Sequence, residues 1–300
     1  MSLFKRKRRI STGLEITNDV FRVLSLERSD NAYVVVHNIC DSIPYELCIT
    51  GDPFFDYGAH LSPIFKYIAD RVGTFDEGVN IALPLGDALI HVVDMPGLNL
   101  EEVRAALRYK IKDYFPFPVD DCVYDVASVD FPNYTDMPEK RFAVAAASRK
   151  LVENIMRAAD ENGIQIDSIE PAQVAAERSI TPLYPEDVGS VYVYVGTESS
   201  VLVLSWRGNG IFYSSLSCGE DEDICSEITK GIDFAQSRCS DFSAKILRIF
   251  GPGASDELCK DLANSAENHI AELSNPFEVH SVNGIADTTG REIVLGLALR

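Results

Sequence analysis

The sequence lacks the signals of membrane-spanning and secreted proteins. No apolar run approaches the roughly 18 residues that a membrane-spanning helix needs. The basic start is followed by polar sequence rather than by the apolar stretch of a secretory signal. We therefore expect a protein that does not cross a membrane on a signal of its own.

The common catalytic and metal-binding signatures are also missing. The seven cysteines and five histidines are scattered, with no Cys-x-x-Cys pair among them. A phosphate-binding Gly-x-x-x-x-Gly-Lys-[Ser/Thr] loop and a Gly-x-Ser-x-Gly elbow are both absent. The sequence thus predicts no metal ligands and no catalytic residues, and the cysteines are interpreted as thiols in a reducing cytoplasm.

What is present indicates a large globular protein with an acidic surface. Its 300 residues, 46% of them hydrophobic, favour two domains or one large bilobed fold. The net charge of −19 argues against nucleic-acid binding. The start is the exception, with five cations and no acidic residue: Lys5, Arg6, Lys7, Arg8 and Arg9. This tail fits contact with an anionic membrane surface, although a basic start is more often a solvated tail.

An internal duplication is the most informative pattern. Residues 14–34 align without gaps to residues 193–213, and each segment is typical of three strands joined by two polar turns. Two lobes that each begin with such a meander would place their first turns on opposite sides of a cleft, where backbone N–H groups can hold phosphates. A further strand, Lys245–Phe250, runs into the turn Gly251-Pro252-Gly253, which in such a fold lies against a nucleoside.

Residues 87–163 between the repeats predict a strand-helix-strand-strand-helix unit. Asn99 is placed to cap the first helix, with Glu102 three residues later, and Pro116 ends that helix. Strands are expected near 122–130 and 141–147, and Ser148 is expected to cap a second helix that ends at Gly163. The unit has the pattern of an inserted subdomain.

This middle segment resembles the signature of PilM-type proteins, the actin-like component of type IV pilus assembly. The resemblance rests on Met95-Pro96, on Ala106–Tyr109 and above all on Tyr114–Asp120, which contains Phe-Pro-Phe-Pro. Other segments fit the same family: Gly13–Ile16, Arg141–Ala147, Glu227–Ser237, Asn275–Phe277 and Gly296–Arg300.

The resemblance implies an α/β, actin-like (ribonuclease H-like) two-lobed fold related to that of the cell-division protein FtsA. Residues 1–9 would form a basic tail, residues 10–86 and 164–188 a first lobe, residues 87–163 the inserted subdomain, and residues 189–300 a trimmed second lobe whose last helix returns to the first.

The resemblance also implies two binding sites. Family members bind nucleotide between the lobes, and the matching positions are Thr17, Asn18, Arg22, Gly196, Thr197, Gly251 and Gly253. They hold the cytoplasmic N-terminal tail of a bitopic membrane protein, PilN, beside the inserted subdomain. There the expected partner-binding residues are Tyr109, Tyr114, Phe115 and Phe117.

Departures from the family pattern affect the nucleotide site at three places, the two phosphate turns and a missing insertion. Thr17 stands where a glycine is usual, and Tyr194 stands where the second lobe has an acidic residue that would orient magnesium. Glu198 adds a carboxylate to the second phosphate turn. A helical insertion that contacts the nucleoside is missing near the acidic run 220–223. We therefore expect no cofactor, with ATP and magnesium bound only if the cleft remains competent.

Two functions follow from the resemblance. One is a non-catalytic cytoplasmic scaffold, peripheral to the inner membrane, that binds a PilN-like tail and other platform components of a pilus or related secretion machine. The alternative is an ATP-binding switch or slow ATPase in the same machinery, supported by Arg22 and by Gly251-Pro252-Gly253. A filament-forming FtsA-like protein fits less well, because residues 291–300 form no amphipathic tail, and a sugar kinase lacks its catalytic aspartate.

Overall fold

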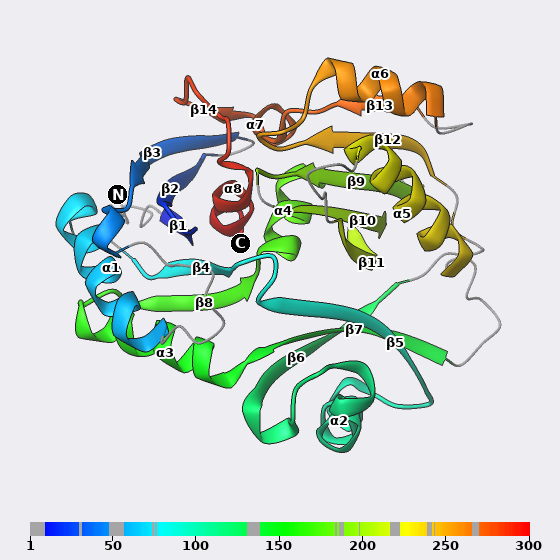
Figure 1. The fold of residues 1–300 in the computed structure, drawn as a ribbon, viewed down its shortest axis with the longest axis horizontal. Helices are drawn as coiled ribbons and strands as arrows, with labels where there is room; N and C mark the ends of the chain where they lie inside the picture. The colour runs from blue at the N-terminus through cyan, green and yellow to red at the C-terminus, as the bar shows by residue number, and fades with distance from the viewer. Residues whose placement is uncertain are drawn as a thin grey trace, which may run out of the picture.

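Two β-sheets of matching topology form the frame of the molecule (Figure 1). The computed structural model describes residues 10–29, 32–47, 57–73, 75, 77–130, 139–183, 185, 189–197, 199–216, 223–238, 242, 244–265 and 270–300. Sheet A has the strand order β14-β3-β2-β1-β4-β8, and sheet C has the order β11-β10-β9-β12-β13. In both, an antiparallel meander is joined by two parallel strands. The two meanders confirm the duplication expected from the sequence.

A smaller sheet, sheet B, has the order β5-β7-β6 and is antiparallel throughout. The strands of sheet A are β1 (Ile10–Ile16), β2 (Val20–Ser29), β3 (Ala32–Ser42), β4 (Val79–Leu83), β8 (Ile166–Pro171) and β14 (Val282–Asn283). Those of sheet B are β5 (Ala88–Pro96), β6 (Cys122–Val129) and β7 (Glu139–Ser148). Those of sheet C are β9 (Gly189–Val195), β10 (Ser200–Trp206), β11 (Asn209–Leu216), β12 (Ala244–Phe250) and β13 (Ile270–Leu273).

The helices cover the faces of these sheets. They are α1 (Tyr57–Val72), α2 (Leu100–Tyr114), α3 (Arg149–Glu161), α4 (Ala172–Ile180), α5 (Ile224–Arg238), α6 (Asp256–Ser265), α7 (Pro276–Val279) and α8 (Glu292–Ala298), with short 3₁₀ turns at Tyr45–Leu47 and Val119–Asp121. None of them, within the described ranges, is long and apolar enough to cross a membrane.

The start of α2 follows the capping pattern that the sequence predicts. The Asn99 side chain accepts hydrogen bonds from the backbone N–H groups of Glu101 and Glu102, at 3.0 and 3.1 Å. The Glu102 carboxylate in turn accepts the Asn99 N–H at 2.8 Å. Three backbone donors at the start of the helix are thus satisfied. Ser148 precedes α3 as expected, but its side chain makes no capping hydrogen bond.

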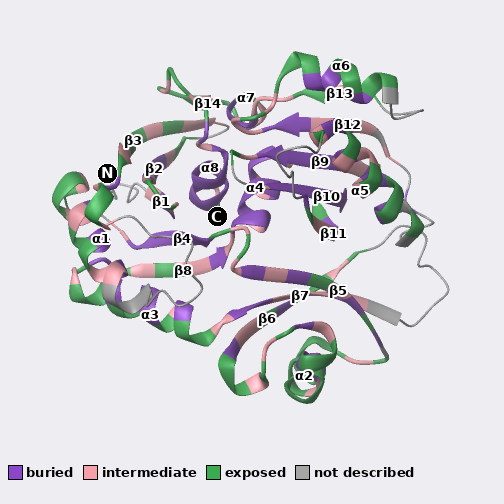
Figure 2. Cartoon of the chain, viewed as in Figure 1, coloured by how far each residue is buried: buried purple, intermediate pink, exposed green. Residues whose placement is uncertain are grey.

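Four apolar cores hold the layers together, and the central one joins the two lobes. Helices α4 and α8 lie in it between sheet A and sheet C, and both are almost fully buried (Figures 1 and 2). The other cores lie under α1 and α3 on sheet A, under α5 and α6 on sheet C, and between α2 and sheet B. Because α8 packs on β1, β2 and β4, the last helix does return to the first lobe.

Close backbone contact between α4 and α8 requires a glycine at one position. A Cβ added to Gly296 would overlap the carbonyl group of Ala175. Only glycine lets the two helices approach this closely, so Gly296 sets the distance between α4 and α8.

The inserted segment differs in one respect from the sequence expectation. Helix α3, expected as the last part of the inserted unit, packs against α1 and adds Leu151 and Ile155 to the core of the first lobe. Only sheet B and α2 share a core of their own. The apolar face of α3 therefore belongs to the core that α1 and sheet A form.

Candidate functional site

The cleft between the lobes brings together most of the predicted nucleotide-site residues. Thr17 and Asn18 lie in the turn after β1, and Gly196 and Thr197 lie in the turn after β9. These turns, Arg22 and Pro252 line one cavity of about 170 Å³, here called the cleft. Gly251 and Gly253 flank Pro252, so the predicted residues converge although more than 170 positions separate the two turns.

A buried ion pair occupies the first-lobe wall of the cleft. Glu15 and Arg22 are direct cross-strand partners in β1 and β2, and their side chains are 3.2 Å apart. Burial raises the pKa of Glu15 from 4.5 to about 7, opposed by the charge and hydrogen bond of Arg22 and reinforced by Glu292. The guanidinium is therefore already engaged with a carboxylate of the same sheet.

Thr17 closes its own turn. Its hydroxyl donates to the carbonyl of Val20 at 2.9 Å, and its backbone N–H donates to the same carbonyl at 2.8 Å. These bonds fix the β1–β2 turn. They also engage the hydroxyl and the backbone N–H of Thr17, which a phosphate-binding turn would direct at the ligand.

Tyr194 covers the glycine turn of the second lobe. Its ring lies edge-on to Phe250, with ring centroids 5.6 Å apart, and its ring carbons lie 3.0 Å from the position of a Cβ at Gly251. Gly251 has a φ of 105°, and Gly253 donates its N–H to Val195 at 2.9 Å. The two glycines therefore leave room for the end of β9 to pack against this turn. Burial raises the pKa of the Tyr194 hydroxyl well above its usual value.

The residues of the cleft do not fit a magnesium-bound triphosphate. A cavity of about 170 Å³ is smaller than the roughly 300–1,000 Å³ of typical ligand pockets. It is lined by Glu15, Asp19 and Asp87, and Glu292 lies close enough to raise the pKa of Glu15. Burial already raises the pKa of Asp87 and Glu292. Further negative charge would be strongly disfavoured there, and the described residues hold no cluster suited to a metal ion.

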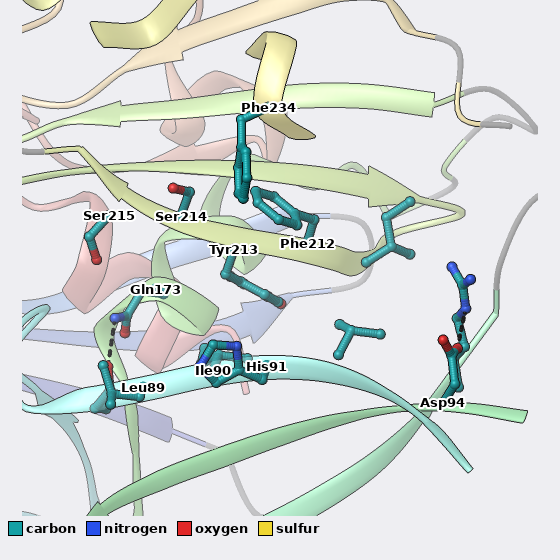
Figure 3. A pocket seen from close by; sticks show the side chains of 14 residues that line it. Leu89, Ile90, His91, Asp94, Gln173, Phe212, Tyr213, Ser214, Ser215 and Phe234 are labelled. Carbon is teal, nitrogen blue, oxygen red and sulfur yellow. Dashed lines mark hydrogen bonds and ion pairs between the residues drawn. The ribbon is translucent and has the colours of Figure 1, made fainter. Parts of the chain in front are cut away.

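A larger cavity lies between the inserted subdomain and the second lobe (Figure 3). It measures about 620 Å³ and runs between β5 and β11, with Gln173 of α4 at one end; we call it the β5–β11 groove. Ile90 and Val92 come from β5, and Phe212 comes from β11. Phe234 of α5 stacks edge-on to Phe212, with ring centroids 5.9 Å apart. The walls are thus mainly apolar.

Both strands that border this groove are edges of their sheets. β5 ends sheet B, β11 ends sheet C, and no ladder joins them. The Ala88 carbonyl accepts a hydrogen bond from the Gln173 amide at 3.0 Å, so it points away from β7. Since alternate residues of a strand present their main-chain groups to the same edge, Ile90 and Val92 present theirs to the groove.

A second cavity of about 440 Å³, here called the α4 pocket, lies beside the groove. Its walls are sheet B at Ala127 and Ala143, helix α4, and the β10–β11 turn. It occupies the place where the sequence predicts a peptide site, between the first lobe and residues 87–163. The larger groove next to it, against the second lobe, was not predicted.

The predicted partner-binding aromatic residues line neither cavity. Phe115 is only 3% exposed and packs in the core between α2 and sheet B, with its ring 5.0 Å from that of His91. Tyr114 and Phe117 pack against the same core, and Tyr109 is 79% exposed on α2. Because α2 covers the opposite face of sheet B, these residues form no part of either cavity wall, and their role in partner binding stays a prediction.

One sequence signal could have identified the groove. The run Ala88–Val93 is apolar on both alternating faces apart from His91, which is typical of a strand covered on both sides. Val93 faces α2, whereas Ile90 and Val92 line the groove. The predicted membrane-contact residues Lys5–Arg9, and also Glu198, lie outside the described residues.

Comparisons with known proteins agree on one fold. The family described as "Type IV pilus assembly protein PilM" matches residues 13–195. Among solved structures, a PilM–PilN type IV pilus biogenesis complex superposes with a TM-score of 0.75 at 18% identity, covering 97% of this chain and 98% of that one.

Two further structures are similar in fold. The cytoplasmic domain of EpsL, an inner-membrane component of the Vibrio cholerae type II secretion system, gives a TM-score of 0.55 at 13% identity, covering 91% and 93% of the two chains. A Bacteroides thetaiotaomicron protein with an actin-like ATPase fold and unknown function gives 0.53 at 11% identity, covering 92% and 95%. No curated protein sequence matches the chain. The predicted actin-like, two-lobed α/β fold is thereby confirmed.

Proposed function

The chain belongs to the PilM family of type IV pilus assembly proteins, and we propose that it acts there as a non-catalytic scaffold that binds the cytoplasmic N-terminal tail of a PilN-like membrane protein. The similar PilM–PilN complex supports a partner of this kind. The scaffold would work in the cytoplasm at the inner membrane, together with other platform components.

The observation that carries this proposal is the β5–β11 groove. It combines a volume of about 620 Å³ with apolar walls and an unpaired strand edge. An extended peptide can add to such an edge, where main-chain hydrogen bonds provide affinity and pockets select alternate side chains. The tail would bind in this way along β5, beneath Phe212 and Phe234.

The main-chain contacts can be tested without disturbing sheet B. Proline is tolerated on an edge strand where its missing N–H faces away from the sheet. Val92→Pro should therefore fold yet remove one donor from the groove, weakening tail binding about tenfold, the value of a hydrogen bond of roughly 1.4 kcal/mol.

Isothermal titration with a synthetic peptide of the tail measures this effect. Val92→Thr keeps both the side-chain shape and the N–H, so it serves as the matched control and should bind nearly as the wild type does. If the wild-type chain fails to bind the tail, the proposed function is wrong. If both variants bind alike, strand addition at β5 is wrong.

The alternative, an ATP-binding switch, receives less support from the cleft. Tyr194 covers Gly251, Arg22 is paired with Glu15, and the cavity is small and acidic. We therefore expect magnesium-ATP to bind weakly or not at all in isothermal titration at millimolar nucleotide. A low-micromolar dissociation constant would favour the switch, and Tyr194→Asp should recover at most part of the affinity.

A further inference from the structure

One side chain lies where the two cavities meet. Among the described residues, Tyr213 is the one that lines both the β5–β11 groove and the α4 pocket. It projects from β11 toward β5, below Phe212 and Phe234 (Figure 3). Its ring therefore stands as a partition between a compartment of about 620 Å³ and one of about 440 Å³.

A buried carboxylate holds this ring in place. The Tyr213 hydroxyl donates a short hydrogen bond to Oε2 of Glu177, and the Ser205 hydroxyl donates to Oε1 at 3.0 Å. Glu177 belongs to α4 of the first lobe and is only 5% exposed, whereas both donors belong to the second lobe. The Tyr213 hydroxyl is thus engaged in a hydrogen bond between the two lobes, so the ring is the part of the side chain that can contact a ligand.

The backbone at Gly210 also packs closely against the Tyr213–Glu177 pair. A Cβ at Gly210 would overlap the Tyr213 hydroxyl and approach Oε2 of Glu177 to 2.6 Å. The start of β11 therefore packs directly against this hydrogen bond, which leaves the Tyr213 side chain little room to change rotamer. A ring restrained in this way resembles the rigid aromatic anchors that dominate peptide and protein interfaces.

We propose that Tyr213 determines which segment of the partner tail is accepted. The proposal rests on the proposed function above. An extended tail would place one apolar side chain on each side of the ring and cross it with a small residue.

The test compares tail affinity in two Tyr213 variants and one control. Tyr213→Ala joins the compartments and should weaken binding of the synthetic tail peptide about 30-fold or more, as for an aromatic anchor. Tyr213→Phe keeps the ring and should stay within about threefold of the wild type. Tyr45→Ala removes an exposed tyrosine of the 3₁₀ turn Tyr45–Leu47, which lines neither cavity, and should change nothing.

Substitutions along the tail peptide distinguish a role of Tyr213 in peptide selection from a purely structural role. Each apolar or small position of the tail is replaced in turn by tryptophan. In the wild-type chain the crossing position should be the least tolerant, and Tyr213→Ala should restore binding of that one peptide. If Tyr213→Ala does not fold, Tyr213→Leu removes the aromatic ring and takes its place in the scan.

Equal affinity of Tyr213→Ala and the wild type for the tail, or uniform tolerance of tryptophan along the peptide, would overturn the inference while leaving the proposed function intact. Failure of the wild-type chain to bind the tail would overturn both. If Tyr213→Ala restores binding of one tryptophan-substituted peptide and of no other, the result supports the Tyr213 ring as a partition between the two cavities.

Discussion

Neutralising Glu177 should change the pH dependence of stability in a defined direction. Burial raises the pKa of Glu177 from 4.5 to about 7, whereas the hydrogen bonds from Tyr213 and Ser205 act in the opposite sense. Below pH 4.5 the carboxyl is protonated in both the folded and the unfolded chain. As the pH rises toward 7, only the unfolded chain releases the proton, so the folded state loses stability; above 7 the loss stays constant.

The size of this loss follows from the difference in pKa. At 1.36 kcal/mol per unit of pKa difference, the shift from 4.5 to about 7 amounts to about 3 kcal/mol, most of which develops between pH 5 and pH 8. Glu177→Gln removes this titration but leaves one hydroxyl without an acceptor, at a cost of about 1 kcal/mol. The variant should therefore be slightly less stable than the wild type at pH 5 and more stable at pH 8.

Thermal unfolding followed by circular dichroism can measure this crossover. For 300 residues, a loss of about 2–3 kcal/mol between pH 5 and pH 8 corresponds to a relative shift in Tm of about 4 °C. The exposed Glu153 of α3 provides the matched control, since Glu153→Gln should show no crossover. If the Tm of Glu177→Gln followed that of the wild type at every pH, ionisation of the buried carboxyl would not destabilise the folded chain by this amount.

Three further outcomes are expected. Gly296→Val should abolish stable folding, because even a Cβ would overlap Ala175 across the seam between α4 and α8, and a soluble variant with a wild-type Tm would contradict this contact. Phe115→Ala should cost about 3–5 kcal/mol of unfolding free energy while leaving tail affinity unchanged, and titration showing the reverse would return Phe115 to the partner site. Replacing Lys5–Arg9 by serine should weaken sedimentation with anionic vesicles, most of all at low salt, whereas equal sedimentation at low salt would make the tail a solvated one.

The sequence predicted the features that depend on local pattern. The strands and turns of both meanders, the capping box at Asn99 and the glycine turn after β12 all appear where residue type and spacing place them. Turn chemistry and alternation act over a few residues, so they can be recognised without knowledge of the fold.

The features that were missed depend on contacts between distant elements. Nothing near Phe115 in the sequence shows that α2 covers the face of sheet B away from the groove. Tyr213 gains its role only through Glu177, which lies 36 positions earlier on another lobe. Likewise, α3 could be identified as a helix, but its packing on α1 is a contact between elements far apart in the chain.

The sequence predicted the cleft only in part. The residues predicted to face one another do so, because the duplication fixes both turns. The consequence of Tyr194 was predicted as a lost magnesium ligand, whereas the structure adds that its ring packs on Gly251. Sequence comparison can mark a substituted position, but it cannot show which space the new side chain fills.

The β5–β11 groove, and not the cleft, is the proposed working site of the protein. The most direct measurement is isothermal titration of the chain with the synthetic tail peptide, first without nucleotide and then with millimolar magnesium-ATP. We predict that the tail binds without nucleotide and that its dissociation constant is the same in both titrations. Binding of the tail only in the presence of magnesium-ATP would contradict this assignment.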